Sequence, residues 1–272
     1  MIELIKVIFL GIVEGITEWL PISSTGHMLL VDQFLQLNQS AAFKEVFFVV
    51  IQLGAILAVM ICYWKQMIPI RWTDVEGISI QWNVIGMWMK VAVACIPGAV
   101  VTFLFDDWVE ANLHTPMVIA TTLILYGICF LVFDGKRVRK VRIENLEQIT
   151  YSVAFGVGLF QTLAIIPGTS RSGAAILGAL LLGVSRVAAA DFVFFLAVPV
   201  MFGWSLVKLM KFGFVFTTPE ILTLLAGSVT AYLVSLIVIR FFLKYVKKHD
   251  FRLFGWYRVI LGILVLFTVF YF

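Results

Sequence analysis

The feature that most constrains this chain is a series of continuous apolar stretches, each about as long as a membrane-spanning helix. Apolar residues make up 62% of the 272 residues and charged residues only 13%, and the mean hydropathy is +1.04. A soluble domain carries roughly 45–50% apolar and about 25% charged residues. Because so few polar side chains cannot cover a water-exposed surface, the composition excludes a soluble enzyme, a secreted domain and a nucleic-acid-binding protein. The sequence predicts an integral membrane protein.

The stretches have the length of helices, whereas the strands of an outer-membrane barrel alternate over about 10 residues. A spanning helix needs about 20 apolar residues, so the chain has room for about ten. We predict an all-α polytopic membrane protein, folded as a single integral membrane domain over residues 1–272. The expected helices cover 2–20, 24–37, 42–63, 83–105, 115–134, 149–166, 170–184, 187–207, 218–242 and 252–272.

Two of these segments, 24–37 and 170–184, are too short to span a bilayer, and each follows a polar break that begins with proline. The breaks read Pro21-Ile-Ser-Ser-Thr-Gly-His27 and Pro167-Gly-Thr-Ser-Arg-Ser-Gly173. We interpret each as the tip of a broken or re-entrant helix hairpin.

The two breaks also resemble copies of one unit. A shift of 146 positions superposes the prolines, and it pairs Ser23 with Thr169 and Ser24 with Ser170. Repeat one then covers about residues 1–134, a loop covers 135–148, and repeat two covers about 149–272. Chance likeness between apolar segments is the alternative.

Basic residues in short loops predict the orientation, because such loops face the cytoplasm. The basic residues of loops 135–148 and 243–252 are Lys136, Arg137, Arg139, Lys140, Arg142, Lys244, Lys247, Lys248 and Arg252. The acidic loop 106–114 should face outward. The first hairpin then enters from outside and the second from the cytoplasm, which makes the repeats inverted in topology. Lys208 and Lys211, on an expected outer loop, do not fit this orientation.

Glu14 and Glu18 lie within the first apolar segment, where ionisable residues indicate a functional site. Their spacing of four places both carboxylates on one helix face. Oxygen ligands of this kind suit Mg²⁺ or Ca²⁺. The alternative is a pair of glutamates that neighbouring helices stabilise.

The first break can bind an anion and can also carry a nucleophile. Ser23 is a candidate N-cap for the helix that starts near Ser24, and a helix N-terminus binds phosphate. His27 lies three residues after Ser24, and a hydroxyl beside an imidazole is an activated-nucleophile arrangement. The alternatives are a purely structural turn and a histidine satisfied within the core.

The second break adds a positively charged side chain. Arg171 lies between Ser170 and Ser172 at the start of a short helix, which Thr169 or Ser170 would cap. Its planar guanidinium matches a phosphate bidentately. An ion pair with Glu14 or Glu18 is the alternative. We expect the basic residue Arg258 to lie near a helix end and to reach the membrane surface.

These motifs resemble the two signature regions of the undecaprenyl-diphosphatase family, the bacterial bacitracin-resistance membrane phosphatases. The regions are Glu14-Gly-Ile-Thr-Glu18-Trp-Leu-Pro21-Ile-Ser-Ser-Thr-Gly-His27 and Pro167-Gly-Thr-Ser170-Arg171-Ser172-Gly. The resemblance implies hydrolysis of undecaprenyl diphosphate to undecaprenyl phosphate, which recycles the cell-wall carrier lipid and confers bacitracin resistance. It also implies a divalent cation and a multi-pass protein of the bacterial inner membrane, with its site toward the periplasm or outer side.

Residue by residue, the family's paired acids fall on Glu14 and Glu18, and its histidine falls on His27. Its hydroxyl cluster falls on Ser23, Ser24 and Thr25, and its basic motif on Ser170, Arg171 and Ser172. The family pattern usually carries threonine where this chain has Ala175, so a hydroxyl at that position is not indispensable if the protein is active.

The resemblance favours a mechanism in which Glu14 and Glu18 hold the cation, Arg171 and the helix starts bind phosphate, and Ser24 attacks with His27 as base. Attack by water that His27 activates is the second version. A secondary transporter or lipid flippase with a midplane anion site is the rival from another class. The oligomeric state stays open between a monomer and a homodimer.

Overall fold

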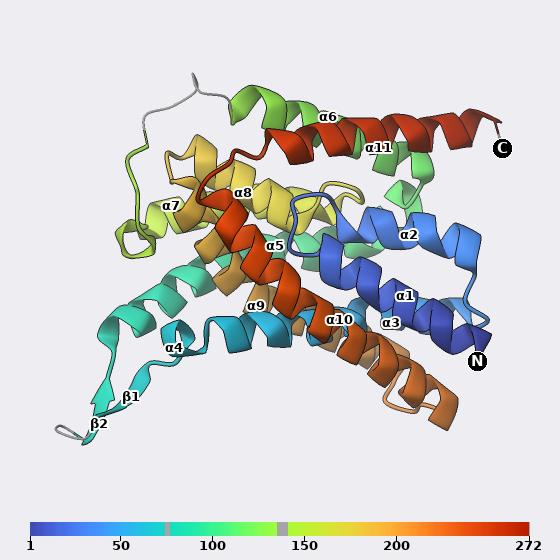
Figure 1. Ribbon diagram of the computed structural model, residues 1–272, viewed down its shortest axis with the longest axis horizontal. Coiled ribbons are helices and arrows are strands. Elements are labelled where there is room, and N and C mark those ends of the chain that lie inside the picture. Colours follow the sequence, from blue (N-terminus) through green and yellow to red (C-terminus); the bar gives the residue numbers. More distant parts are fainter. Residues whose placement is uncertain (74–76, 135–140, 272) are drawn as a thin grey trace.

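The structure is a computed structural model that describes residues 1–73, 77–134 and 141–271. Six helices of this part of the chain are long and apolar enough to cross a membrane, and shorter apolar helices accompany them. Figure 1 shows both chain termini at one end of the molecule and the single two-stranded hairpin of the described residues at the other end. The predicted all-α polytopic membrane fold is confirmed, whereas the count of ten helices stays a prediction.

The first half consists of a helix, a break, a short helix and then three long helices. Its elements are α1 (Ile2–Thr17), α2 (Ser24–Leu35), α3 (Ala41–Cys62), α4 (Trp64–Met67), β1 (Ile70–Thr73), β2 (Gly77–Ile80), α5 (Trp82–Leu113) and α6 (Pro116–Phe133). The second half repeats this order without the hairpin. Its elements are the 3-10 helix η1 (Leu146–Gln148), α7 (Tyr151–Thr162), η2 (Leu163–Ile165), α8 (Arg171–Leu181), α9 (Arg186–Phe212), α10 (Thr218–Val246) and α11 (Arg252–Tyr271).

Five of the longer elements start where a serine or threonine can act as an N-cap. In each of them the hydroxyl oxygen accepts a hydrogen bond from the backbone N–H three residues later, which satisfies one of the unpaired donors of the first turn. These caps are Ser40, Thr115, Thr150, Ser185 and Thr217.

The helices of the two halves also have corresponding packing partners. Helix α1 packs on α10 and α7 on α5, while α3 packs on α10 and α9 on α5. Helices α3 and α9 pack on each other, as do α6 and α11. Exchanging the two halves leaves this set of pairs unchanged, as an inverted repeat requires. The repeat itself and its boundaries stay predictions.

Helices α5 and α9 are longer than predicted, which corrects two loop predictions. The acidic segment 106–114 lies largely within α5, and Lys208 and Lys211 lie in α9. Lys208 contacts Glu110 at 2.9 Å, and Lys211 contacts Asp107 at 2.9 Å. Because these charges pair between neighbouring helices, the polar turns stay helical. The two lysines therefore balance the acids at this end, which explains why they departed from the expected charge pattern.

Three further differences concern loops. The antiparallel hairpin β1–β2, in which Ile70 lies opposite Ile80, lies between the expected helices 42–63 and 83–105 and was not predicted. Lys244 lies in α10 and not in a loop. The predicted basic residues Lys136, Arg137, Arg139 and Lys140 lie outside the described residues.

Candidate active site

Each break ends at a serine that caps the next helix. Ser23 precedes α2 and accepts a hydrogen bond from the N–H of Gly26 at 3.3 Å, and Ser170 precedes α8 and accepts one from Gly173 at 3.1 Å. Both serines have positive φ, at 74° and 72°. Such a backbone conformation costs on the order of 1–3 kcal/mol and persists only where the surroundings impose it. The predicted cap at Ser23 is confirmed, and of the two candidates for the second cap it is Ser170 and not Thr169.

The matched caps correct the register between the breaks. Ser23 and Ser170 lie 147 positions apart, and the same shift pairs Gly26 with Gly173. The prediction that Ser23 corresponds to Thr169 is therefore wrong by one residue. The shift of 146 was taken from the prolines, but the cap hydrogen bond sets where a helix begins, and the second break has one more residue between its proline and its cap.

In the corrected register, Ser24 and Arg171 occupy the same position, the first residue of each short helix. Both side chains reach Glu18. Its Oε1 accepts a hydrogen bond from Nη2 of Arg171 at 2.9 Å, and its Oε2 accepts one from the hydroxyl of Ser24. The prediction that segments about 146 positions apart meet inside the protein is confirmed by these contacts. In Figure 1 both breaks lie near the middle of the molecule along its long axis.

The second break also contacts the backbone of the first break beside Glu18. The hydroxyl of Ser172 donates to the backbone carbonyl oxygens of Glu18 and Leu20, at 3.3 and 3.4 Å. The hydroxyls of Ser170 and Ser172 are 3.3 Å apart. Thr25, the third hydroxyl predicted from the first break, is exposed at the second position of α2.

Several buried polar atoms beside Glu18 have no hydrogen-bond partner. Both carboxylate oxygens of Glu14 are in this state, as is Nη1 of Arg171. Glu14 is 0% exposed, and the charges nearest to it are those of Glu18 and Arg171. Buried polar groups are nearly always paired, so unpaired ones indicate where an ion, water or ligand binds. Arg171 thus forms the ion pair that the sequence left as an alternative, and it still has a donor available for an anion.

His27 is held by groups other than Ser24. Its Nδ1 lies 2.7 Å from the carbonyl oxygen of Ser23, and its Nε2 lies 2.6 Å from the hydroxyl of Tyr257 on α11. Since a carbonyl only accepts, Nδ1 carries a proton, and in the neutral ring Nε2 accepts from Tyr257. The two rings are stacked, with centroids 5.6 Å apart. The expected Ser24–His27 hydrogen bond is not formed, because Ser24 bonds to Glu18 instead.

Sequence reasoning missed the role of Arg258. Instead of reaching the membrane surface, this side chain is 0% exposed and donates to the carbonyl oxygens of Pro21, Gly168 and Thr169. Backbone carbonyls carry no residue-type signature, so the sequence holds no sign of these partners. The signal that was available is a basic residue within an apolar segment, next to Tyr257.

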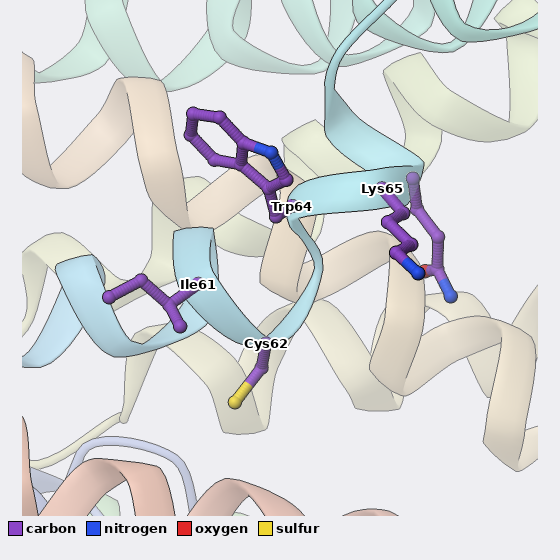
Figure 2. A pocket seen from close by; sticks show the side chains of 5 residues that line it. Ile61, Cys62, Trp64 and Lys65 are labelled. Carbon is purple, nitrogen blue, oxygen red and sulfur yellow. The ribbon is translucent and has the colours of Figure 1, made fainter. Parts of the chain in front are cut away.

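A separate surface hollow lies at the junction of α3 and α4. Figure 2 shows it with the side chains of Ile61, Cys62, Trp64, Lys65 and Gln66. None of the predicted site residues lines it. It has no carboxylate or hydroxyl side chain among these five residues, so it does not offer the chemistry found at the breaks.

The fold and the site together define a class of protein. They describe a polytopic membrane protein in which two helix N-termini, two arginines, a histidine, two carboxylates and several hydroxyls meet within the apolar interior. Helix N-termini and arginine bind phosphate groups. The class is a polytopic membrane protein with a buried polar cluster whose groups are of the kind that bind phosphate.

Comparison with known proteins gives the family. The family model described as bacitracin resistance protein BacA matches residues 7–264, and the chain belongs to this family. The undecaprenyl-diphosphatase of Enterococcus faecalis is 60% identical over 266 residues, which is 97% of this chain and 96% of that protein. The undecaprenyl-diphosphatase of Desulfitobacterium hafniense is 56% identical over 98% of this chain and 96% of its own length.

Proposed function

We propose that this chain is an undecaprenyl-diphosphatase, which hydrolyses undecaprenyl diphosphate to undecaprenyl phosphate and inorganic phosphate. The observation that carries the proposal is the convergence of Ser24 and Arg171 on Glu18, at the starts of two short helices. The reaction recycles the lipid carrier of cell-wall synthesis. It also removes the diphosphate lipid that bacitracin binds, and so confers resistance.

The terminal phosphate binds between the two helix starts. The free N–H groups of α2 and α8 and the unpaired Nη1 of Arg171 donate to its oxygens. Ser23 and Ser170 cap these helices, and Ser172 and Thr25 lie at their first turns. Because phosphoryl transfer depends mainly on positioning and on charge stabilisation, these donors do most of the catalytic work.

Ser24 is the nucleophile, and Glu18 accepts its proton. The Ser24 oxygen forms a bond to the terminal phosphorus as the bond from that phosphorus to the bridging oxygen breaks, and its electron pair leaves with undecaprenyl phosphate. The hydroxyl proton moves to Glu18, whose Oε2 already accepts the Ser24 hydrogen bond. Water then attacks the phosphoserine phosphorus, and Ser24 regains a proton as inorganic phosphate departs.

His27 acts in the second half of this reaction. With Nδ1 bonded to the Ser23 carbonyl, the Nε2 lone pair is the basic site of the ring, and Tyr257 covers it in this structure. When Tyr257 moves aside, Nε2 can take a proton from the attacking water. Direct attack of such a water on the diphosphate, with Ser24 only orienting the phosphate, stays the alternative mechanism.

Glu14 and Glu18 fit a divalent cation, because both oxygens of Glu14 are buried and unpaired. Arg171 is already ion-paired with Glu18, so it does not offset the further negative charge of Glu14 and of a diphosphate. Mg²⁺ commonly uses one or two carboxylates together with phosphate oxygens and water. No group of three or more potential metal ligands occurs among the described residues, which suits that mode of binding. When bound, Mg²⁺ or Ca²⁺ would neutralise charge on the phosphates.

Removing the cation is expected to abolish phosphate release, and adding Mg²⁺ or Ca²⁺ is expected to restore it. The measurement is phosphate release by purified protein in detergent with EDTA and then with a titration of each cation. A Glu14→Gln variant should need a higher cation concentration for half-maximal activity. Full activity in EDTA, with Glu14→Gln unchanged, would contradict a cation at these residues.

An Arg171→Ala variant is expected to lose on the order of 10²–10³ in kcat/KM, the usual effect of removing one donor that stabilises transition-state charge. Because Ala leaves Glu18 buried without its cation, Arg171→Lys is the control that keeps the charge. It should recover only part of the activity, since an ammonium cannot donate to Glu18 and phosphate with the same fork geometry. A near-normal rate for Arg171→Ala in folded protein would contradict this role.

The experiment that tests the function is phosphate release from a polyprenyl diphosphate by purified protein in detergent. A transporter or flippase cannot move a lipid across a bilayer in detergent, whereas a phosphatase still releases phosphate. Release by wild type that Glu18→Gln abolishes supports the enzyme. No release under any cation condition would overturn the proposal in favour of the transporter.

The basic residues support a proposal for the location of the site. Lys244, Lys247, Lys248 and Arg252 lie around the α10–α11 connection, and short basic loops face the cytoplasm. In Figure 1 this connection lies away from the end with the termini, from which α1 enters. We therefore place the protein in the bacterial inner membrane with its site open toward the periplasm or outer side. A homodimer is compatible with this arrangement.

A further inference from the structure

Helix α11 contributes a residue that the proposed reaction does not yet use. Arg258 lies on this helix, is fully buried and stacks over the ring of Tyr126 on α6, 5.5 Å from its centroid. A buried guanidinium is costly unless its donors are satisfied. Its partners therefore show what this residue holds in place.

The donors of Arg258 join the two breaks. Nη1 donates to the carbonyl oxygen of Pro21 at 3.1 Å, in the first break. Nη2 donates to the carbonyl oxygens of Gly168 and Thr169 at 2.8 and 2.9 Å, in the second break. Two carbonyl oxygens of α6 lie farther away, at 3.4 and 3.5 Å. Arg258 is thus hydrogen-bonded to the residues just before both helix starts.

Local sequence allows this close approach. A Cβ added at Gly173 would lie 3.2 Å from Nη1 of Arg258, and it would lie equally close to the hydroxyl of the cap Ser170. Glycine at this position lets the guanidinium lie beside the first turn of α8. Thr122 of α6 holds the same break from another side, because its hydroxyl donates to the carbonyl oxygen of Pro167 at 2.6 Å.

Arg258 also differs from Arg171 in charge pairing. Arg171 is paired with Glu18, whereas no carboxylate lies within 4.0 Å of Arg258 among the described residues. All the hydrogen-bond partners of Arg258 among the described residues are neutral carbonyls. Its positive charge is therefore not cancelled by a direct partner, and it lies next to the place where the two helix N-termini meet.

We propose that Arg258 is a positioning residue for the phosphatase: it fixes the starts of α2 and α8 relative to each other, so that Ser24 and Arg171 face one phosphate. The inference rests on the proposed function, since it assigns a role within that site. Its fixed charge adds to the attraction for the anionic substrate. A misplacement of about 1 Å can cost about 10²-fold in rate, so holding two helix starts together has a measurable effect.

The test compares Arg258→Lys with Arg186→Lys. Arg186 also joins helices, since its Nε donates to Asp134 at 2.8 Å, but it lies outside the two breaks. Lysine keeps the charge at either position but cannot donate to carbonyls of both breaks through one planar fork. We expect Arg258→Lys to lose about 10²-fold in kcat, with a much smaller change in KM. Arg186→Lys should keep kcat within about threefold of wild type, even if it lowers the melting temperature as much as Arg258→Lys does.

A third variant, Arg258→Met, removes the charge and should raise KM in addition to lowering kcat. Melting temperatures of all three variants identify any that fail to fold. The inference is overturned if folded Arg258→Lys keeps kcat within about threefold, or if Arg186→Lys loses as much as Arg258→Lys. If Ser24→Ala and Arg171→Ala lose activity while Arg258→Lys keeps normal activity, the role of Arg258 is refuted and the proposed function still stands. Normal activity in all of them would defeat the proposed site as well.

Discussion

A Ser24→Ala variant is expected to lose phosphate release by on the order of 10⁵-fold or more, as other hydrolases do when their nucleophile is removed. The reason is local. Ser24 is the first residue of α2, and its hydroxyl is bonded to Glu18, the carboxylate that also holds Arg171. Alanine keeps the helix and removes only the attacking oxygen. The measurement is single-turnover phosphate release at saturating cation.

The matched control for this variant is Thr25→Ala. Thr25 is the next residue of the same helix and is exposed, so its hydroxyl can be removed without opening a buried gap. We expect a loss of less than about tenfold, as for a single weak phosphate contact. Acid quenching with a ³²P-labelled diphosphate should trap label on wild type and none on Ser24→Ala. Near-normal release by Ser24→Ala without trapped label would favour direct attack by water.

Apolar patterning gave most of the fold. Continuous apolar segments predicted the helices. The N-caps at several starts, such as Ser40 and Thr217, were identified only in the structure. The ends of α5 and α9 were predicted too early, because charged residues in a membrane protein look like loops. Lys208 and Glu110 pair between these helices, and single-sequence periodicity contains no information on such pairing.

The sequence predicted which residues form the candidate site but not which of them are hydrogen-bonded to each other. Glu18, Ser24 and Arg171 could be singled out because polar residues are rare in this chain, and the structure brings them together. The partner of Ser24 was expected to be His27, three residues away on the same helix. Local spacing favoured a Ser24–His27 pair. In the structure, the break between Glu18 and Ser24 brings the Glu18 carboxylate within hydrogen-bond distance of the Ser24 hydroxyl instead.

The contribution of α11 could not be predicted for a different reason. Arg258 bonds to backbone carbonyls, and Tyr257 bonds to a histidine 230 positions earlier in the chain. In a sequence, a buried charged residue is usually matched with a residue of opposite charge. Within the described part of the chain, neither Arg258 nor Tyr257 has a partner of that kind. Arg258 and Tyr257 reach the site only because α11 packs against α6 and beside the two breaks.

A Glu18→Gln variant is expected to lose on the order of 10⁴-fold in kcat, because one substitution removes two functions. A general base contributes about 10²–10⁴-fold, and the amide of Gln cannot take the Ser24 proton. The amide is also uncharged, so it holds Arg171 less firmly than the carboxylate does at 2.9 Å. The side chains have nearly the same shape, and the variant should fold. Phosphate release at saturating Mg²⁺ or Ca²⁺ separates this effect from weaker cation binding.

A double-mutant cycle decides whether Glu18 acts through Ser24. If the carboxylate is the base for this hydroxyl, the combined loss in Ser24→Ala with Glu18→Gln should be far smaller than the product of the two single losses. The loss that Glu18→Gln still adds to Ser24→Ala should be only the part that comes from its contact with Arg171. The cycle with Glu14→Gln is the comparison, because Glu14 does not bond to Ser24 and its loss should multiply that of Ser24→Ala. Independent, multiplying losses for Glu18 and Ser24 would show instead that Glu18 serves Arg171 or the cation only, and the proton of the attacking group would then need another acceptor.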